Sequence, residues 1–177
     1  LHANQGPFVS LREAIIAANN TAGADTIRFG IDGAGPHTLS LTSALPAITG
    51  EVTLDGSSEP DYAGSPVITL SGTTVAGGAV GLDLQSSNNA ILGITVREFG
   101  GAGIRVASGS TGNTIGDNII TANGGTGIAL VSPGAAAAIQ NNLIHANGGQ
   151  GIDLGNDGAV AANDAGDGDT GANGQLN

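Results

Sequence analysis

The feature that most constrains this chain is a short motif that recurs about every 24 residues. In each copy a glycine precedes an apolar residue, a variable residue and a second apolar residue. The copies are Gly81-Leu82-Asp83-Leu84, Gly103-Ile104-Arg105-Val106, Gly127-Ile128-Ala129-Leu130 and Gly151-Ile152-Asp153-Leu154, at intervals of 22, 24 and 24 residues. One such unit cannot bury its own apolar face, so a fixed interval indicates units that stack on one another.

Further columns of like residues keep the same 24-residue offset. They are Asn89-Ala90-Ile91 with Asn113-Thr114-Ile115, Val96 with Ile120 and Ile144, Asn118 with Asn142, and Asn123 with Asn147. Alternation with a period of two residues is typical of strands with one buried face. We therefore expect parallel, in-register ladders in which Ile128 points inward and Ala129 outward. The asparagines should form amide ladders at the turns.

Composition agrees with thin, stacked layers. Of 177 residues, 40% are hydrophobic but only 2% are aromatic, and 32 are glycine. A core without large rings must be filled by Ile, Leu, Val and Ala. A disordered glycine-rich chain is the alternative, but disorder gives no reason to hold apolar residues in a fixed register.

The first half is less regular and carries a different start. Strands are expected over 26–29, 38–41, 52–55 and 67–71. Ser10-Leu11-Arg12-Glu13 reads as a capping box, and apolar residues follow at helical spacing as far as Ala18. The prediction is one all-β domain over 1–177, a right-handed parallel β-helix of six or seven coils. It comprises an N-terminal segment 1–9, an amphipathic capping helix 10–20, coils over 26–155 and an acidic Gly/Asp/Asn tail 156–177.

The chain resembles the bacterial SLREA-type secreted proteins, a group of right-handed parallel β-helix repeat proteins. The resemblance rests on Ser10-Leu11-Arg12-Glu13-Ala14-Ile15 with Ala18-Asn19, on Leu45-Pro46-Ala47-Ile48-Thr49, on Leu54-Asp55-Gly56, and on the segment 151–158. It covers most of the chain and implies a β-helix fold and export from the cell. It implies no established catalytic residues.

Charge excludes several partner classes. The net charge is −11, and the only residues of the Lys and Arg types are Arg12, Arg28, Arg97 and Arg105. Phosphate binding needs a basic stripe, so nucleic acid is not expected as a partner. No apolar run approaches the roughly 20 residues of a membrane span, so membrane insertion is not expected.

Many parallel β-helices act on polysaccharides, which makes catalysis the alternative to test. The charged candidates are Asp83, Arg105, Arg97 and Glu98. Asp83 and Arg105 share an outward column one coil apart, where a cross-strand ion pair is expected. Asp153 shares that column but lies three coils from Asp83, roughly 14 Å at the ladder spacing. This distance is too long for the catalytic carboxylate pair of a glycoside hydrolase.

Platforms for stacking sugars are also scarce, with no Trp and with Tyr62 as the single tyrosine. His2, His37 and His145 are scattered and read as surface residues. We therefore expect no enzyme activity.

The acidic tail supplies a candidate metal site. Asp164, Asp167, Asp169 and Asn173 lie among glycines and could wrap a calcium ion in oxygen ligands. The alternative is a solvated acidic loop. No cofactor is expected to be required, and calcium is the one candidate.

These observations favour an extracellular or cell-surface module with a structural or surface-display role, as an adhesive or filament-forming subunit. The alternative is a polysaccharide-binding or polysaccharide-cleaving β-helix. The last coil, near Ile152 and Leu154, should leave an uncovered layer. The expected partner is therefore a second copy stacked head to tail, with segment 1–9 as the docking strand, or a following domain of the same protein.

Overall fold

The computed structural model describes residues 9–159 as a parallel β-solenoid that follows one helix. The helix is α1 (Leu11–Asn20). The strands are β1 (Asp25–Arg28), β2 (His37–Ser40), β3 (Val52–Asp55), β4 (Ile68–Ser71), β5 (Leu82–Leu84), β6 (Ala90–Leu92), β7 (Ile94–Arg97), β8 (Ile104–Val106), β9 (Asn113–Gly116), β10 (Ile119–Thr121), β11 (Ile128–Val131), β12 (Ala137–Gln140), β13 (Leu143–His145) and β14 (Ile152–Gly155). A short 3-10 helix, η1, covers Gly56–Ser58. The predicted all-β solenoid with an N-terminal helix is confirmed.

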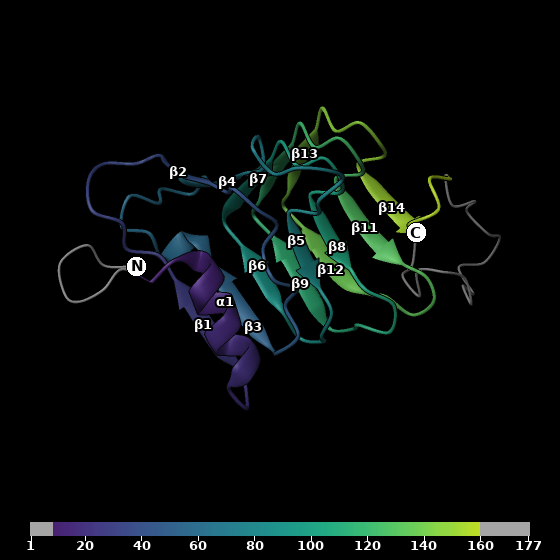
Figure 1. The fold of residues 1–177 in the computed structure, drawn as a ribbon, viewed down its shortest axis with the longest axis horizontal. Helices are drawn as coiled ribbons and strands as arrows, with labels where there is room; N and C mark the ends of the chain where they lie inside the picture. Colours follow the sequence, from purple (N-terminus) through teal and green to yellow (C-terminus); the bar gives the residue numbers. More distant parts are fainter. Residues whose placement is uncertain (1–8, 160–177) are drawn as a thin grey trace.

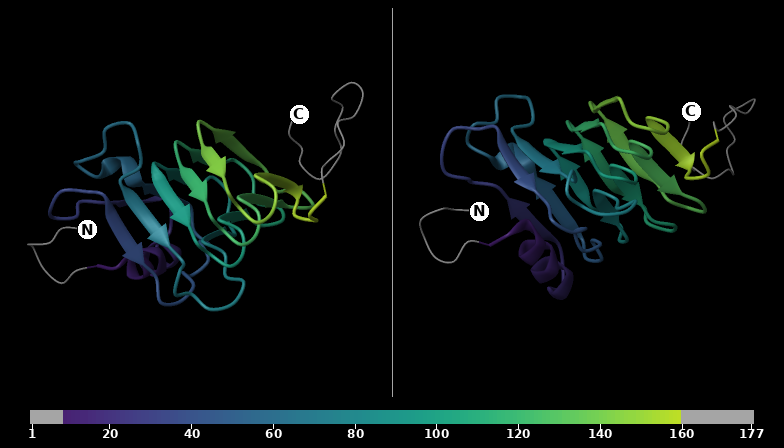
Figure 2. Two further views of the ribbon diagram at one scale, coloured as in Figure 1. Left: turned by 90° about the horizontal axis from the view of Figure 1, so that it is seen from above. Right: turned by 45° about the horizontal axis from the view of Figure 1, so that its top comes forward.

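Three parallel sheets run along the solenoid axis, one strand per coil in each. Their orders are β1-β3-β6-β9-β12, β2-β4-β7-β10-β13 and β5-β8-β11-β14. The coils stack on one another along the solenoid axis (Figures 1 and 2). We name the end with α1 and β2 the head and the end with β12, β13 and β14 the tail.

The repeat motif lies on the third sheet in the predicted register. Ile104 pairs with Ile128 and Ile128 with Ile152, while Val106, Leu130 and Leu154 form the neighbouring column. A Cβ added at Gly127 would lie 2.5 Å from the carbonyl oxygen of Gly151. The glycine of the motif is therefore required by a close approach of the chain in the next coil.

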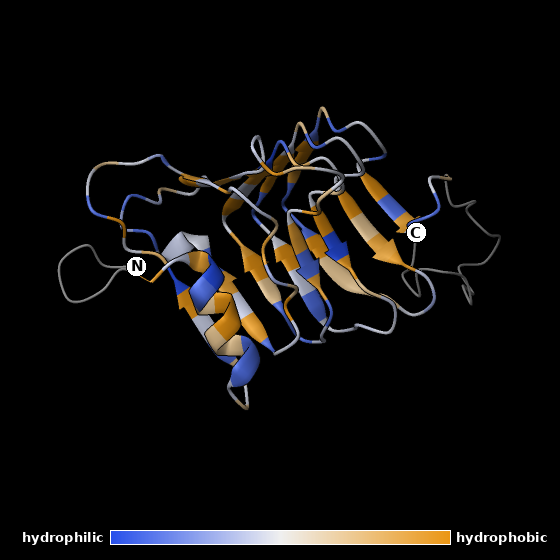
Figure 3. Cartoon of the chain, viewed as in Figure 1, coloured by the Kyte–Doolittle hydropathy of each residue, from blue (hydrophilic) through white to orange (hydrophobic). Residues whose placement is uncertain are grey.

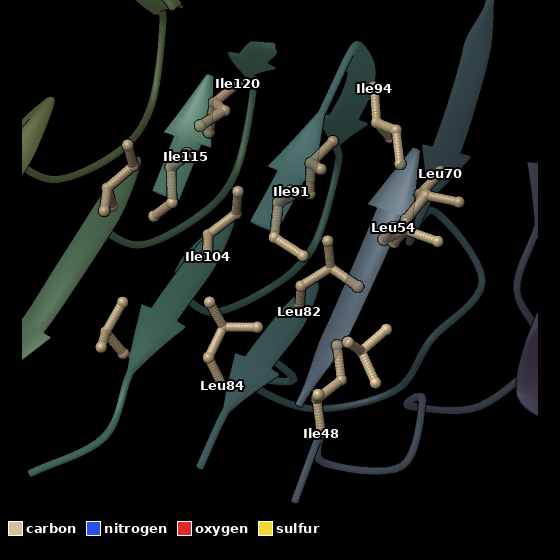
Figure 4. Close-up of a cluster of buried hydrophobic side chains, with 14 of the residues drawn as sticks. Ile48, Leu54, Leu70, Leu82, Leu84, Ile91, Ile94, Ile104, Ile115 and Ile120 are labelled. Carbon is tan, nitrogen blue, oxygen red and sulfur yellow. The ribbon is translucent and has the colours of Figure 1, made fainter. Parts of the chain in front are cut away.

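The core is a column of aliphatic layers. Ile104, Ile128 and Leu130 have no exposed surface. Apolar and polar residues alternate along the strands (Figure 3), and aliphatic side chains from all three sheets meet inside the coils (Figure 4).

One outward residue of this register is buried. Ala129 lies on the outward side, as predicted, yet it is fully buried. In the ladder it lies between Arg105 and Asp153, and Asp153 is itself buried.

The number of coils also differs from the prediction. The described residues make about five coils rather than six or seven, with five, five and four strands in the three sheets. Val52 and Asn89, in successive coils, are 37 residues apart, whereas Asn89 and Asn113 are 24 apart. Long connections in the first half consume residues that the regular spacing assigns to additional coils.

The corners of the coils use left-handed residues followed by asparagine. Ala122 and Ala146 have φ of 56° and 54°, and Asp117 and Asn141 both have φ of 56°. The asparagines of the predicted ladders come directly after these residues. The amide ladders are confirmed: Asn123 donates from its side-chain nitrogen to Oδ1 of Asn147 at 3.0 Å, and Asn118 does the same to Asn142 at 3.0 Å. Asn89 and Asn113 form a third ladder at 2.9 Å.

The helix begins with the predicted capping box. The Glu13 amide donates to Ser10 Oγ at 3.2 Å, and the Ser10 amide donates to Glu13 Oε2 at 2.8 Å. Leu11, Ile15 and Ala18 are buried, and α1 lies beside β1 at the head of the solenoid (Figure 1). The helix therefore covers the first aliphatic layer, as predicted for a cap.

Two polar side chains of α1 bind the backbone of the connection between β2 and β3. Asn19 Oδ1 accepts from the amides of Thr49 (2.8 Å) and Gly50 (3.2 Å), and its Nδ2 donates to Ala47 O at 2.7 Å. Arg12 donates to the carbonyl oxygens of Ser43 (2.8 Å) and Ala44 (2.7 Å). These side chains replace hydrogen bonds that a preceding coil would make.

Candidate functional site

The outward row of the third sheet holds the first pair of charged candidates. Arg105 Nε donates to Asp83 Oδ1 at 2.8 Å, and Arg105 Nη2 donates to Asp83 Oδ2 at 2.7 Å. The hydrogen bonds from Arg105 to Asp83 raise the pKa of the guanidinium, while its partial burial acts in the opposite direction. This bidentate geometry is that of a cross-strand ion pair, as the sequence predicted.

Asp153 lies in the same row but does not meet this pair. Three ladder steps separate Asp83 from Asp153, roughly 14 Å at the ladder spacing. Its side chain is buried, and Oδ2 accepts from the amide of Gly158 at 3.1 Å. The structure therefore brings together Asp83 and Arg105 and leaves Asp153 apart.

The second pair, Arg97 and Glu98, lies at the end of β7 on a different sheet. Glu98 Oε2 accepts from the hydroxyls of Thr73 (2.6 Å) and Ser71 (2.9 Å), and it lies 3.5 Å from Arg97 Nε. The hydroxyl of Thr73, then that of Ser71, lowers the pKa of Glu98, with a smaller contribution from Arg97. Both hydroxyls come from the preceding coil, where Ser71 of β4 pairs with Arg97 of β7. The sequence analysis did not predict these contacts because the offset of 26 residues between Ser71 and Arg97 departs from the 24-residue repeat.

The histidines differ from the prediction in one case. His145 is exposed on β13, as expected, with its Nδ1 3.3 Å from Thr121 Oγ1. His37 was predicted on the surface, but it lies in the column of Ile68 and Ile94, and only 13% of its side chain is exposed. The signal in the sequence was its two-residue spacing from Leu39, which puts both on the same face of β2.

A buried carboxylate faces His37. Glu59 is 2% exposed, and its Oε1 lies 3.9 Å from His37 Nε2. Its Oε2 accepts from the amide of Ile31 at 3.0 Å, and nearby Asp61 accepts from the amide of Gly35 at 2.7 Å. The two carboxylates tie the connection after β1 to the connection after η1, which is a structural role.

The predicted calcium ligands Asp164, Asp167, Asp169 and Asn173 lie outside the described residues, as does His2. Within residues 9–159, no group of three or more His, Asp or Glu side chains is placed to hold a metal ion. Over the same range, α1 is too short and too polar to cross a membrane, and no other helix qualifies.

Apolar side chains on the surface gather at the two ends of the solenoid. In the described part of the chain, the large apolar side chains that count as exposed are Val9 (48%), Ile16 (45%), Leu143 (56%) and Ile152 (39%). The first two lie at the head and the last two at the tail. A hollow of about 390 Å³ opens at the head between the first turn of α1 and β2.

The arrangement as a whole defines a class: a parallel β-solenoid with three sheets, paired outward charges and a helix that covers one end. Residues 51–165 match the family described as "Right handed beta helix region". The chain belongs to this family. Comparisons with curated proteins and with solved structures gave no match.

Proposed function

We propose that this chain is an extracellular structural or surface-display module that associates with copies of itself. The observation that carries the proposal is the contrast between the sides of the solenoid and its ends. On the sides, the predicted charged candidates bind one another. At the ends of the described solenoid, large apolar side chains are exposed, and exposed apolar side chains are a feature of association surfaces.

The resemblance to the SLREA-type secreted proteins supports the extracellular part of the proposal. Arg12 and Asn19 belong to the motif that carries this resemblance, and both bind the backbone beside the cap. The motif thus has a physical role in closing the head of a solenoid. A structural role for the motif agrees with a module whose function is its shape.

The polysaccharide alternative requires groups placed for catalysis or sugar stacking. Asp83 and Arg105 neutralise each other, and Glu98 already accepts hydrogen bonds from two hydroxyls. Both carboxylates would have to give up these bonds to act on a substrate. A structural role needs no such change and is therefore preferred.

The test combines size measurement with a search for activity. Light scattering after size exclusion, over a hundredfold concentration range, should show species larger than the monomer, and negative-stain microscopy should show elongated particles. In parallel, release of reducing ends or unsaturated products from a panel of acidic and neutral polysaccharides should stay at background. A strictly monomeric protein, or one that cleaves a polysaccharide, would contradict the proposal.

A further inference from the structure

A hollow of about 180 Å³ opens on the flank of the solenoid, at the corner where the first sheet passes into the second. One wall is the connection between η1 and β4, at residues 64–66. The rest of the lining comes from two successive coils, at Asp117, Asn118, Ile119, Asn141 and Leu143. The hollow therefore lies outside the aliphatic core, on a surface formed by described residues.

The hollow exists because the connection covers one corner of the solenoid and leaves the next corners open. Gly93, Asp117 and Asn141 occupy the same position in three successive coils, with φ of 64°, 56° and 56°. A Cβ at Gly93 would lie 2.9 Å from Ser57 N and 3.2 Å from Tyr62 Cε2, so the connection packs directly on this glycine. Asp117 and Asn141, in contrast, are exposed. The carboxylate of Asp117 is therefore presented where the cover stops.

The Asp117 carboxylate has no partner within the part of the chain that the structure describes, where it accepts no hydrogen bond and forms no ion pair. The neighbouring Asn118 differs, because its side-chain nitrogen donates to Ile91 O at 2.8 Å and to Asn142 Oδ1 at 3.0 Å. The outward Asp83 is also engaged, by Arg105. Asp117 thus offers the hollow an anionic acceptor that the fold does not use.

The walls beside this carboxylate are aliphatic. Ile119 and Leu143 point outward from β10 and β13 and are neighbours in the ladder, and Pro66 completes the apolar lining. Leu143 is 56% exposed. The described residues that line the hollow include no aromatic side chain, so it lacks a platform for stacking a sugar ring. Aliphatic walls with a carboxylate beside them suit a side chain that has a methylene stem and a cationic head.

The charge of the whole chain also favours a cationic occupant. The net charge is −11, and a field of one sign attracts ligands of the opposite sign. A second copy of the chain is a poor source of this cation. It contains no lysine, and Arg12 and Arg105 bind groups of their own molecule. The cation is therefore better supplied by a different, basic protein.

We propose that this hollow is the docking site for a basic segment of a partner protein, which inserts a lysine or arginine side chain. The stem of that side chain packs against Ile119 and Leu143, and its charged group binds the Asp117 carboxylate. This inference goes beyond the proposed function, which concerns the association of copies, and gives the displayed module a partner of opposite charge.

Binding of synthetic peptides tests the chemistry of the occupant. The probe is a fluorescent peptide of alternating lysine and serine. Its control is the same peptide with every lysine acetylated, which removes the charge and keeps the stem. Fluorescence anisotropy should show saturable binding of the lysine peptide and none of the acetylated one. Equal binding of the two peptides, or no binding of either, would overturn the proposal.

Variants of acidic residues locate the site. Asp117→Asn removes the charge and suits the left-handed backbone, because asparagine tolerates this conformation. It should weaken binding of the lysine peptide about tenfold, as expected when one partner of an ion pair is lost. The matched control is Glu51→Gln, which removes one charge from an exposed residue outside the hollow. Equal losses in the two variants would mean that net charge alone attracts the peptide, and the site would be wrong.

The apolar wall is tested separately from the charge. Leu143→Ser should weaken binding several-fold because the stem loses apolar contact, whereas Ile16→Ser, at an exposed apolar residue on α1, should not. Backbone amide signals of Ile119 and Leu143 should shift in NMR spectra on addition of the lysine peptide. Shifts caused by a neutral oligosaccharide and not by the peptide would assign the hollow to a sugar and contradict the proposal.

The same variants distinguish a second copy from a basic partner. If Asp117→Asn removes larger species of the chain itself but leaves peptide binding intact, the occupant is a second copy and the basic partner is excluded. The proposed function is judged by the size of the original chain without peptide. A failure of the docking site and a failure of self-association are therefore separate results.

Discussion

Single asparagines at the corners connect successive coils. Asn123 is 1% exposed, and its side chain hydrogen-bonds to groups of both neighbouring coils. Its Oδ1 accepts from the Phe99 amide at 3.1 Å, and its Nδ2 donates to Val96 O at 3.2 Å and to Asn147 Oδ1 at 3.0 Å. An amide suits this position because it carries a donor and an acceptor on one short side chain.

Replacing this amide should be costly. We expect Asn123→Ala to lower the free energy of unfolding by about 2–4 kcal/mol, because it leaves buried backbone groups without partners. Chemical denaturation monitored by circular dichroism measures the change. The control is Gln140→Ala, at an exposed position, which should change stability by less than about 0.5 kcal/mol. Similar losses in the two variants would show that the ladder contributes little.

The lowered pKa of Glu98 gives a prediction about the stability of the protein at acid pH. Its carboxylate is held by Thr73 and Ser71, so the folded pKa lies below the ordinary value of 4.5. A depressed folded pKa contributes stability above the unfolded pKa, and this contribution is lost as pH falls through the folded pKa. The thermal midpoint should therefore fall less steeply below about pH 4.5 in Glu98→Gln than in the original chain.

The double variant Ser71→Ala/Thr73→Val is the companion to this measurement. It keeps the carboxylate but removes the two hydroxyl donors, so it should flatten the pH profile in the same way. Calorimetry across pH 3–7 makes the comparison. A profile unchanged in both variants would mean that these hydrogen bonds do not persist in solution.

At the scale of elements, α1 acts as a substitute for a missing coil. Its apolar face packs on the first layer, while Asn19 supplies the hydrogen bonds that a preceding strand would make to Ala47, Thr49 and Gly50. Asn19→Ala should destabilise the protein by about 1–3 kcal/mol, because these backbone groups lose their partners.

The neighbouring residue offers a close control for this prediction. Asn20 is exposed and donates to Ile16 O within the same helix. Asn20→Ala should therefore change the midpoint of denaturation little. If both variants behave alike, the contact of Asn19 with the 43–50 connection does not stabilise the cap.

The strands of the repeat give a second prediction at this scale. Ile128 is fully buried inside β11 between Ile104 and Ile152. Ile128→Asp should unfold the protein at room temperature, since an unpaired charge in an aliphatic layer costs several kcal/mol or more. Circular dichroism and one-dimensional NMR detect the loss of structure.

The control for Ile128→Asp must be an exposed outward residue, and Ala129 does not qualify because it is buried. Ala138 on β12 is exposed and suits the purpose. Ala138→Asp should remain folded with a midpoint near that of the original chain. Equal damage from both substitutions would contradict the register described above.

For the whole molecule, the net charge of −11 is spread over a chain with few cations. Divalent ions would relieve the repulsion among the carboxylates of the acidic segment 156–177, whose candidate calcium ligands lie outside the described residues. We expect millimolar calcium at low salt to raise the thermal midpoint, and Asp167→Asn/Asp169→Asn to remove that rise. Sodium chloride at equal ionic strength is the control. The same rise in thermal midpoint with sodium alone would show that segment 156–177 is a solvated acidic loop and binds no calcium.

The sequence by itself determined the coil. The interval of the Gly-apolar-x-apolar motif set the register of Ile104, Ile128 and Ile152, and the corner asparagines marked the ladders. Ser10 and Glu13 defined the start of the helix. These features were legible because each depends on residues close in sequence or at a constant offset, where local geometry and stacking impose a period.

The tertiary structure determined the contacts that the 24-residue repeat does not predict. The pairing of β4 with β7 brought Ser71 and Thr73 to Glu98. Connections of unequal length reduced the coils to about five. They also placed Glu59 opposite His37 inside the head. The burial of Ala129 on the outward side of its strand was not predicted, and the role of Asn19 depends on a connection 28–31 residues away. Such contacts follow from how whole coils pack, because each depends on two segments whose separation in the chain is not fixed by any repeat.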